Sequence, residues 1–281
     1  MDFLQLVKQR FARDRVGLIF AILLLAIYLV ALTAQWIMPY DPMKMDLRAV
    51  FNPPTFAHPL GTDQFGRDVL SRVILATQVS ARVATAAAVI GLTIGTALGM
   101  YVGYVGGLAE SIVMRLTDIM LIFPTIMLAI VVVTIAGPSE WGVIIALAVS
   151  WIPPFVRLSR AVTLSVREEL YVEASIAVGS GRWQVLRHHI WPNISSPIIV
   201  QGTLTLPIVV LSASSLSFLG LGVQPPTPEW GQMLNAAKDF LRTSPYLLIG
   251  PGAALFIFVL ASNMVGDALQ ETLNPRLKQR K

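Results

Sequence analysis

The chain has 281 residues, of which 55% are hydrophobic and only 13% are charged. A soluble domain carries roughly 25% charged residues, so this composition excludes an ordinary soluble protein and indicates a membrane protein. The chain has no cysteine, which excludes disulfides, thiolate metal sites and cysteine nucleophiles. Its net charge of +5 does not call for a nucleic-acid partner, because basic residues also gather on the cytoplasmic side of membrane proteins.

Long apolar runs predict six membrane spans, because a helix needs about 20 apolar residues to cross the hydrocarbon core of a bilayer. The runs cover residues 17–38, 83–108, 119–139, 141–156, 194–219 and 243–266. The first run exceeds the roughly 7–15 residues of a signal-peptide core and lacks a small-residue cleavage site, so we expect it to be retained. The fourth run is short, and we expect its helix to continue through Arg157.

The distribution of Lys and Arg predicts the side on which each end of the chain lies. Four basic residues precede the first span, five lie between residue 157 and the fifth span, and four lie in the C-terminal tail. The loops expected on the opposite side, 39–82 and 220–245, hold six besides Arg82 at the boundary. We therefore expect both termini in the cytoplasm, in agreement with an even number of spans.

A short amphipathic helix is predicted between the fourth and fifth spans. Apolar or small residues recur there at helical spacing, at Leu170, Ala174, Ala177 and Val178. The sequence Gly179-Ser180-Gly181 is expected to end this helix, and small residues at Ala174, Ser175 and Gly179 would let another surface approach the backbone closely. The residues alone leave two interpretations open, a helix resting on lipid headgroups and a helix that docks on a partner protein.

Glycines recur every fourth residue along the second span, at Gly91, Gly95, Gly99, Gly103 and Gly107. Helical geometry places them on one face, where two backbones can come into contact. The partner of this face is either another helix of the same chain or a second membrane subunit.

Four motifs follow one another in order along the chain. They are Gly61-Thr62-Asp63-Gln64-Phe65-Gly66-Arg67-Asp68; Glu173-Ala174-Ser175 with Gly179 and Pro192; Phe218-Leu219-Gly220-Leu221-Gly222 with Pro225-Pro226 and Glu229-Trp230-Gly231; and Asn263-Met264-Val265-Gly266-Asp267 with Pro275-Arg276-Leu277. The set resembles the membrane subunits of ABC importers, in the branch that carries dipeptides, oligopeptides and nickel. It is similar to the subunit type with a Gly-Thr-Asp-x-x-Gly-Arg-Asp loop. Ser175, Gln270 and Asn274 depart from the usual Ala, Arg and Asp of this branch.

The resemblance implies an all-α membrane protein with six transmembrane helices, the type I ABC importer permease fold, in the bacterial inner membrane. The helix at 173–179 would then be the coupling helix that docks on the ATPase, through Glu173, Ala174, Ser175 and Gly179. The implied partners are a homologous second permease, two ATP-binding cassette ATPases that bind ATP and Mg, and a periplasmic or lipid-anchored solute-binding protein. Lipid surrounds the spans, and no cofactor is expected in this chain.

Three regions follow from this plan. Residues 1–79 hold the N-terminal tail, the first span and a long periplasmic loop, and residues 80–268 form a five-helix permease core with the coupling segment 164–192. Residues 269–281 form a basic cytoplasmic tail. The outer loops are the expected contact surfaces for the binding protein, with Glu229 and Trp230 as contact residues.

The sequence contains no phosphate-binding Gly-x-x-x-x-Gly-Lys loop, no Gly-x-Ser-x-Gly elbow and no His-Glu-x-x-His motif. We therefore expect a transport subunit that couples ATP hydrolysis by partners to uptake of peptides or similar small solutes, and not an enzyme. His58 lies across the membrane from His188 and His189, so no metal site is expected. The alternative is a secondary transporter or channel, which would need acidic residues within the spans or paired broken repeats.

Overall fold

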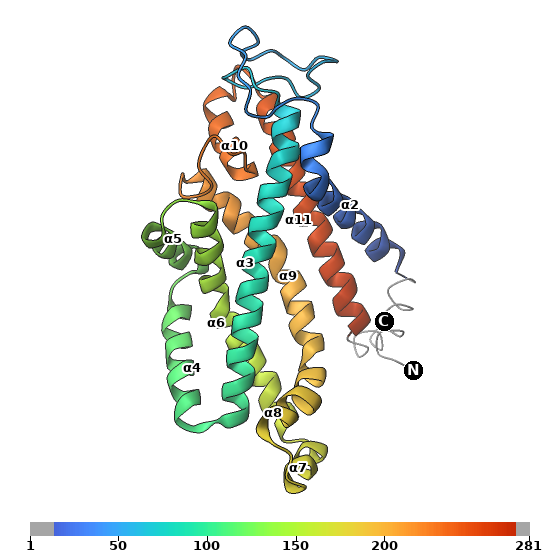
Figure 1. Ribbon diagram of the computed structural model, residues 1–281, viewed down its shortest axis with the longest axis vertical. Helices are drawn as coiled ribbons and strands as arrows, with labels where there is room; N and C mark the ends of the chain where they lie inside the picture. Colours follow the sequence, from blue (N-terminus) through green and yellow to red (C-terminus); the bar gives the residue numbers. More distant parts are fainter. Residues whose placement is uncertain (1–13, 274–281) are drawn as a thin grey trace.

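The computed structural model describes residues 14–273, and every regular element in this part of the chain is a helix (Figure 1). The long helices run roughly along the longest dimension of the molecule, with the loop after α2 at one end and α7 at the other. The elements are α2 (Arg15–Ile37), α3 (Val69–Val105), α4 (Gly107–Ile122), α5 (Thr125–Ala136), α6 (Glu140–Arg167), α7 (Leu170–Ala177), α8 (Arg182–Val185), the π-helix η1 (Leu186–Ile190), α9 (Trp191–Phe218), α10 (Trp230–Ala237), the 3-10 helix η2 (Lys238–Phe240) and α11 (Tyr246–Leu273).

Within residues 14–273, five continuous helical segments are long and apolar enough to cross a membrane, and the bent pair α4–α5 makes a sixth when it is counted as one span. The five are α2, α3, α6, the continuous run 182–218 that joins α8, η1 and α9, and α11. The prediction of an all-α membrane protein with six spans is confirmed in this sense. The start of α2 lies against the end of α11, because Gly17 is packed on Ala268.

The second span begins earlier than its apolar run. Helix α3 starts at Val69, so the outer loop ends at Asp68 and the prediction that it extends to Arg82 is wrong. Asp68 caps the helix, since its carboxylate accepts the Ser71 N–H at 2.7 Å. The first turns of α3 contain Arg72 and Ser80, which are buried against protein and therefore need no apolar composition.

The third span is broken. Helices α4 and α5 are bent by 98° at Phe123-Pro124, and the pair begins at Gly107, twelve residues before the apolar run 119–139. Proline disfavours the helical conformation of the residue before it, and Phe123 is indeed extended, with φ −85° and ψ 135°. Ion pairs hold α4 on the side of α6, from Arg157 to Asp118 at 2.6 Å and from Arg160 to Glu110.

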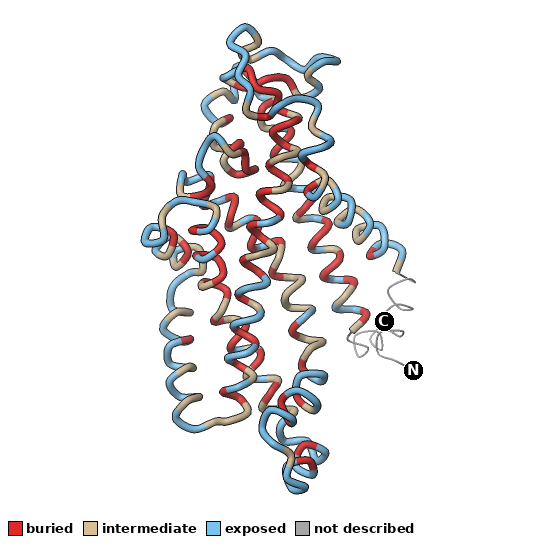
Figure 2. The backbone as a smooth tube through the Cα atoms, in the orientation of Figure 1, coloured by how far each residue is buried: buried red, intermediate tan, exposed pale blue. Residues whose placement is uncertain are grey.

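Burial follows the contact of α3 with α6 and with the inner faces of α9 and α11, whereas α2 and α4 are mostly exposed (Figure 2). Large apolar side chains lie on the exposed faces, such as Leu32 of α2 at 69% and Ile122 of α4 at 74% exposure. Apolar surface of this extent is typical of a protein surrounded by lipid or by other subunits.

The glycine face of α3 packs on α6 of the same chain. A Cβ atom on Gly95 would lie 2.6 Å from Cβ of Phe155 and 2.7 Å from the carbonyl oxygen of Ile152, so only glycine fits. Gly91, Gly99 and Gly103 are buried against the same helix, at successive turns. Gly107 is different, because it opens α4 with a positive φ and has no atom within 4 Å of a Cβ position. The structure therefore favours packing within the subunit over packing against a second one.

We expect Gly95→Leu to destabilise the chain by more than the roughly 1–3 kcal/mol typical of overpacked cores, because two backbones would have to separate. The matched control is Ala97→Leu, which adds the same kind of bulk to an exposed position of α3. The thermal midpoint of the purified chain in detergent measures both. Equal midpoints for the two variants would contradict the assigned contact.

The orientation in the membrane is tested by single cysteines in this cysteine-free chain. Thr55 is exposed in the outer loop, and Gly181 is exposed beside α8 with an ordinary φ of −67° and free space around it. We expect an impermeant thiol reagent to label Thr55→Cys but not Gly181→Cys in intact spheroplasts. The reverse pattern would place the termini outside the cell.

Candidate functional site

Helix α7 forms the tip of the molecule farthest from the loop after α2 (Figure 1). It ends as the sequence predicts, because Gly179 adopts a φ of +85° that favours glycine. The N–H of Gly179 donates to the carbonyl oxygen of Ile176 at 3.0 Å, and the N–H of Ser180 donates to the carbonyl oxygen of Ser175 at 3.1 Å. These bonds satisfy the last carbonyls of the helix.

One face of α7 is open to solvent. Glu173, Ala174 and Gly179 are exposed, and the flanking Leu170 and Val178 are 81% and 84% exposed. Exposed apolar residues around a carboxylate are typical of a protein-binding surface. Ser175 is different, because it is buried against the chain itself and cannot belong to that surface.

The opposite face of α7 is fixed to the spans. Val172 is fully buried in a small apolar cluster with Val185, Leu186, Ile190 and Ile194 of the α8–η1–α9 run. Side chains from the ends of α3 and α6 nearest α7 pack on this cluster, namely Met100, Tyr104, Val162 and Val166. Val172 therefore connects α7 to the ends of three spans, α3, α6 and the run 182–218.

At the other end of the molecule, α10 folds back from the outer loop onto α9, α11 and α3 (Figure 1). Its N-terminal residue Trp230 is completely buried and lies 5.7 Å from Phe258, centroid to centroid. Glu229, which caps the helix, is 2% exposed. The expectation that these two side chains contact a binding protein is corrected, because the Trp230 ring is fully enclosed and the Glu229 carboxylate is taken up by hydrogen bonds within the chain.

Glu229 joins three elements through hydrogen bonds. Its carboxylate accepts from the hydroxyl of Ser80 in α3 at 3.1 Å and from that of Ser214 in α9 at 3.5 Å. It also accepts the N–H of Gln232 at 3.0 Å. Burial raises the pKa of the Glu229 carboxyl, and the hydrogen bonds to it oppose that shift. The arrangement makes Glu229 a structural clamp between α10 and the spans.

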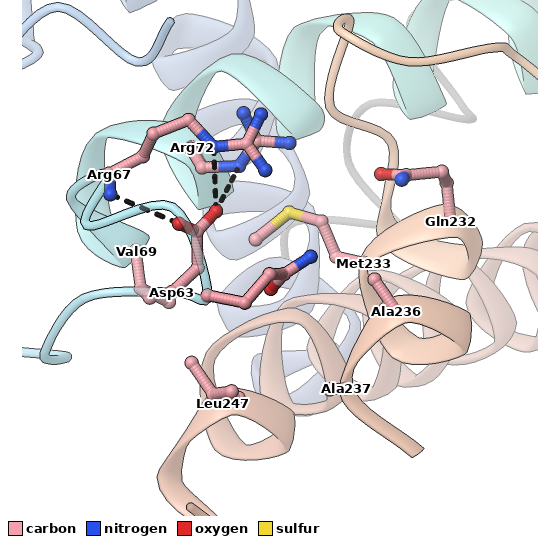
Figure 3. A pocket seen from close by; sticks show the side chains of 10 residues that line it. Asp63, Arg67, Val69, Arg72, Gln232, Met233, Ala236, Ala237 and Leu247 are labelled. Atoms are coloured by element: carbon pink, nitrogen blue, oxygen red, sulfur yellow. Dashed lines mark hydrogen bonds and ion pairs between the residues drawn. The ribbon is translucent and has the colours of Figure 1, made fainter. Parts of the chain in front are cut away.

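The loop before α3 is organised by two aspartates of the Gly61–Asp68 motif. Asp63 accepts the Arg67 Nε–H at 2.7 Å and lies 3.6 Å from Nε of Arg72, at the pocket shown in Figure 3. Asp68 accepts the Ser71 hydroxyl at 2.6 Å and lies 2.9 Å from Nδ1 of His58. The sequence showed this motif as a family resemblance, but it did not show that His58 and Arg72 complete the cluster.

Comparisons with known proteins decide the family. The model of the binding-protein-dependent transport system inner membrane component matches residues 95–279, which is more than half of the chain. This chain belongs to that family. A second model, the N-terminal TM domain of oligopeptide transport permease C, matches residues 2–54 of the permease.

Full-length relatives support the same assignment. The glutathione transport system permease protein GsiD of Pectobacterium atrosepticum is 40% identical over 271 residues, covering 96% of this chain and 90% of the relative. The proteins of the same name from Escherichia coli O6:K15:H31 and Shigella boydii serotype 4 are also 40% identical, over 96% of this chain and 89% of theirs. The permease is therefore a membrane subunit of a bacterial ABC importer in the inner membrane, as its motifs predicted, and the secondary-transporter alternative is not supported.

We expect Glu229→Ala to lower the stability of the permease by about 2–4 kcal/mol, because the Gln232 N–H and the Ser80 hydroxyl lose their acceptor in a buried place. The control is Asp239→Ala, which removes an exposed carboxylate from η2 and should cost no more than about 0.5 kcal/mol. Thermal unfolding in detergent compares the two. A loss that does not exceed the control would contradict the clamp.

Proposed function

We propose that the permease forms half of a translocation pathway for peptides or similar small solutes and docks on a cytoplasmic ATPase through α7. The observation that carries this proposal is the two-sided character of α7. Its outer face is exposed around Glu173, while Val172 on its inner face is fixed to the ends of three spans. A helix of this kind can receive a push from a partner and pass it to the membrane part.

The proposed complex contains this permease, a homologous second permease, two ATP-binding cassette ATPases and a solute-binding protein outside the membrane. The family description supports the binding protein, because the family is binding-protein-dependent. The sequence has no phosphate-binding loop, which supports binding of ATP and Mg by separate subunits. Within residues 14–273, no group of three or more His, Cys, Asp or Glu is placed to hold a metal ion.

The solute class rests on the relatives. The names of these relatives give glutathione as the transported molecule, and glutathione is itself a small peptide. We therefore propose peptide-like solutes of low molecular weight for this permease.

In the proposed mechanism, ATP binding closes the two ATPases, and closure moves α7 together with the apolar cluster at its base. The ends of α3, α6 and α9 move with it and change which side of the pathway is open. Shifting such a two-state equilibrium from 1:99 to 99:1 requires about 5.5 kcal/mol of differential binding. ATP and the loaded binding protein supply this free energy.

The docking assignment is tested by reversing a charge on the open face of α7. We expect Glu173→Lys to reduce solute uptake by the reconstituted complex at least tenfold, because the new lysine would meet the surface that now accommodates a carboxylate. The matched control is Glu271→Lys on the exposed surface of α11, which should leave uptake unchanged. Uptake by Glu173→Lys at the native rate would show that α7 does not dock through this face.

A further inference from the structure

A small polar pocket lies at the outer end of the permease, between the loop before α3 and the helix α10 (Figure 3). Its volume is about 30 Å³, which is room for about two water molecules. Asp63, Arg67 and Arg72 form one wall, and Gln232 and Met233 of α10 lie on the other.

The charged groups of the pocket do not balance. Asp63 is the one carboxylate among the pocket-lining residues, and its Oδ2 atom lies within ion-pair distance of both Arg67 and Arg72. These arginines are 6% and 3% exposed. The two guanidinium groups therefore share one carboxylate, since the second buried aspartate of the loop, Asp68, is engaged by His58 and Ser71 instead.

The two guanidinium groups also have free donors. A guanidinium carries five N–H donors, whereas the hydrogen bonds within residues 14–273 engage only Nε of Arg67, with Asp63, and Nη1 of Arg72, with the carbonyl of Pro42 at 3.0 Å. Figure 3 shows the two guanidinium groups close together beside the Asp63 carboxylate. Paired guanidinium groups are well suited to bind a carboxylate through two parallel bonds.

The wall formed by α10 is compatible with an anion. The buried Oε1 atom of Gln232 accepts no hydrogen bond from the described residues. If the side-chain amide turned by 180°, its N–H groups would take the place of this oxygen and could donate to an anion in the pocket. No hydrogen bond of the oxygen would be lost. Apolar neighbours, Met233 and Leu247 among them, lower the local dielectric constant and strengthen a charge pair formed there.

We propose that this pocket receives an aspartate or glutamate side chain of the solute-binding protein, held by Arg67 and Arg72. The proposal rests on the proposed function, which places the binding protein at this end of the permease. The pocket is far too small for a peptide, but it fits the tip of an acidic side chain. The pocket lies between the loop before α3 and α10, so an inserted carboxylate would contact both of these segments at once.

The test compares charge removal inside and outside the pocket, in the complete complex reconstituted in lipid nanodiscs. We expect Arg67→Gln to weaken the apparent affinity of the loaded binding protein about tenfold, which corresponds to loss of one charge-assisted contact. Arg67→Lys keeps the positive charge but cannot form the two parallel hydrogen bonds of a guanidinium group. We expect this variant to have an affinity between those of the native and Arg67→Gln complexes. Arg48→Gln removes an exposed arginine from the same loop and should change the affinity by less than about twofold, as most exposed substitutions do.

A competition experiment identifies the chemistry. Formate replacing chloride at constant ionic strength should weaken the binding protein's affinity for the native complex but not for the Arg67→Gln complex. An Arg67→Gln complex that elutes as an intact assembly and binds like Arg48→Gln would overturn the proposal. Formate binding that leaves the binding protein's affinity unchanged would also overturn it, because the pocket would then hold an anion from solution. If the native complex shows no response to binding protein at all, the proposed function fails before the pocket is tested.

Discussion

The contact of α3 with α6 is the constraint on which the rest of the permease depends. Four glycines let the two backbones approach at successive turns, so that Gly95 lies directly on Ile152 and Phe155. The two backbones are so close at these glycines that sliding one helix along the other would bring a larger residue of α3 against the backbone of α6. In a membrane, where lipid tails are as apolar as leucine, such close packing is the main source of attraction between helices. The other spans are arranged around this pair.

A second constraint links the two ends of the molecule. The run 182–218 is one continuous helical segment that begins in the apolar cluster between α7 and the spans. It ends beside Ser214, which bonds to Glu229 at the base of α10. One continuous helical segment therefore extends from the base of α7, the helix proposed to dock on the ATPase, to the clamp that holds α10. Events at either end act on the same helix, which gives a physical route for coupling between them.

Sequence reasoning succeeded where a residue has only one physical use. Gly179 was expected to end a helix, and its φ of +85° agrees; the glycine spacing of α3 predicted a close contact. It failed where burial depends on distant residues. Glu229 looks like a surface carboxylate, yet it bonds to Ser80, which lies 149 positions away in the sequence. Likewise, a search for apolar runs finds only helix segments that face lipid. The first turns of α3 are polar and face protein, so the predicted span began too late. The capping residue Asp68 was the signal for that start.

The corner between α4 and α5 affects how well the subunit fits in lipid before it assembles with its partners. Sixteen residues of α4 rise about 24 Å, so a helix of this length that starts at one surface of the hydrocarbon core, which is about 30 Å thick, ends inside it. Helix ends leave backbone carbonyls and N–H groups without helical partners, and Ile122 and Phe123 are 74% and 54% exposed there. Hydrocarbon cannot satisfy such groups. A corner in that position is poorly compatible with lipid in a solitary subunit, so protein neighbours or water must complete it.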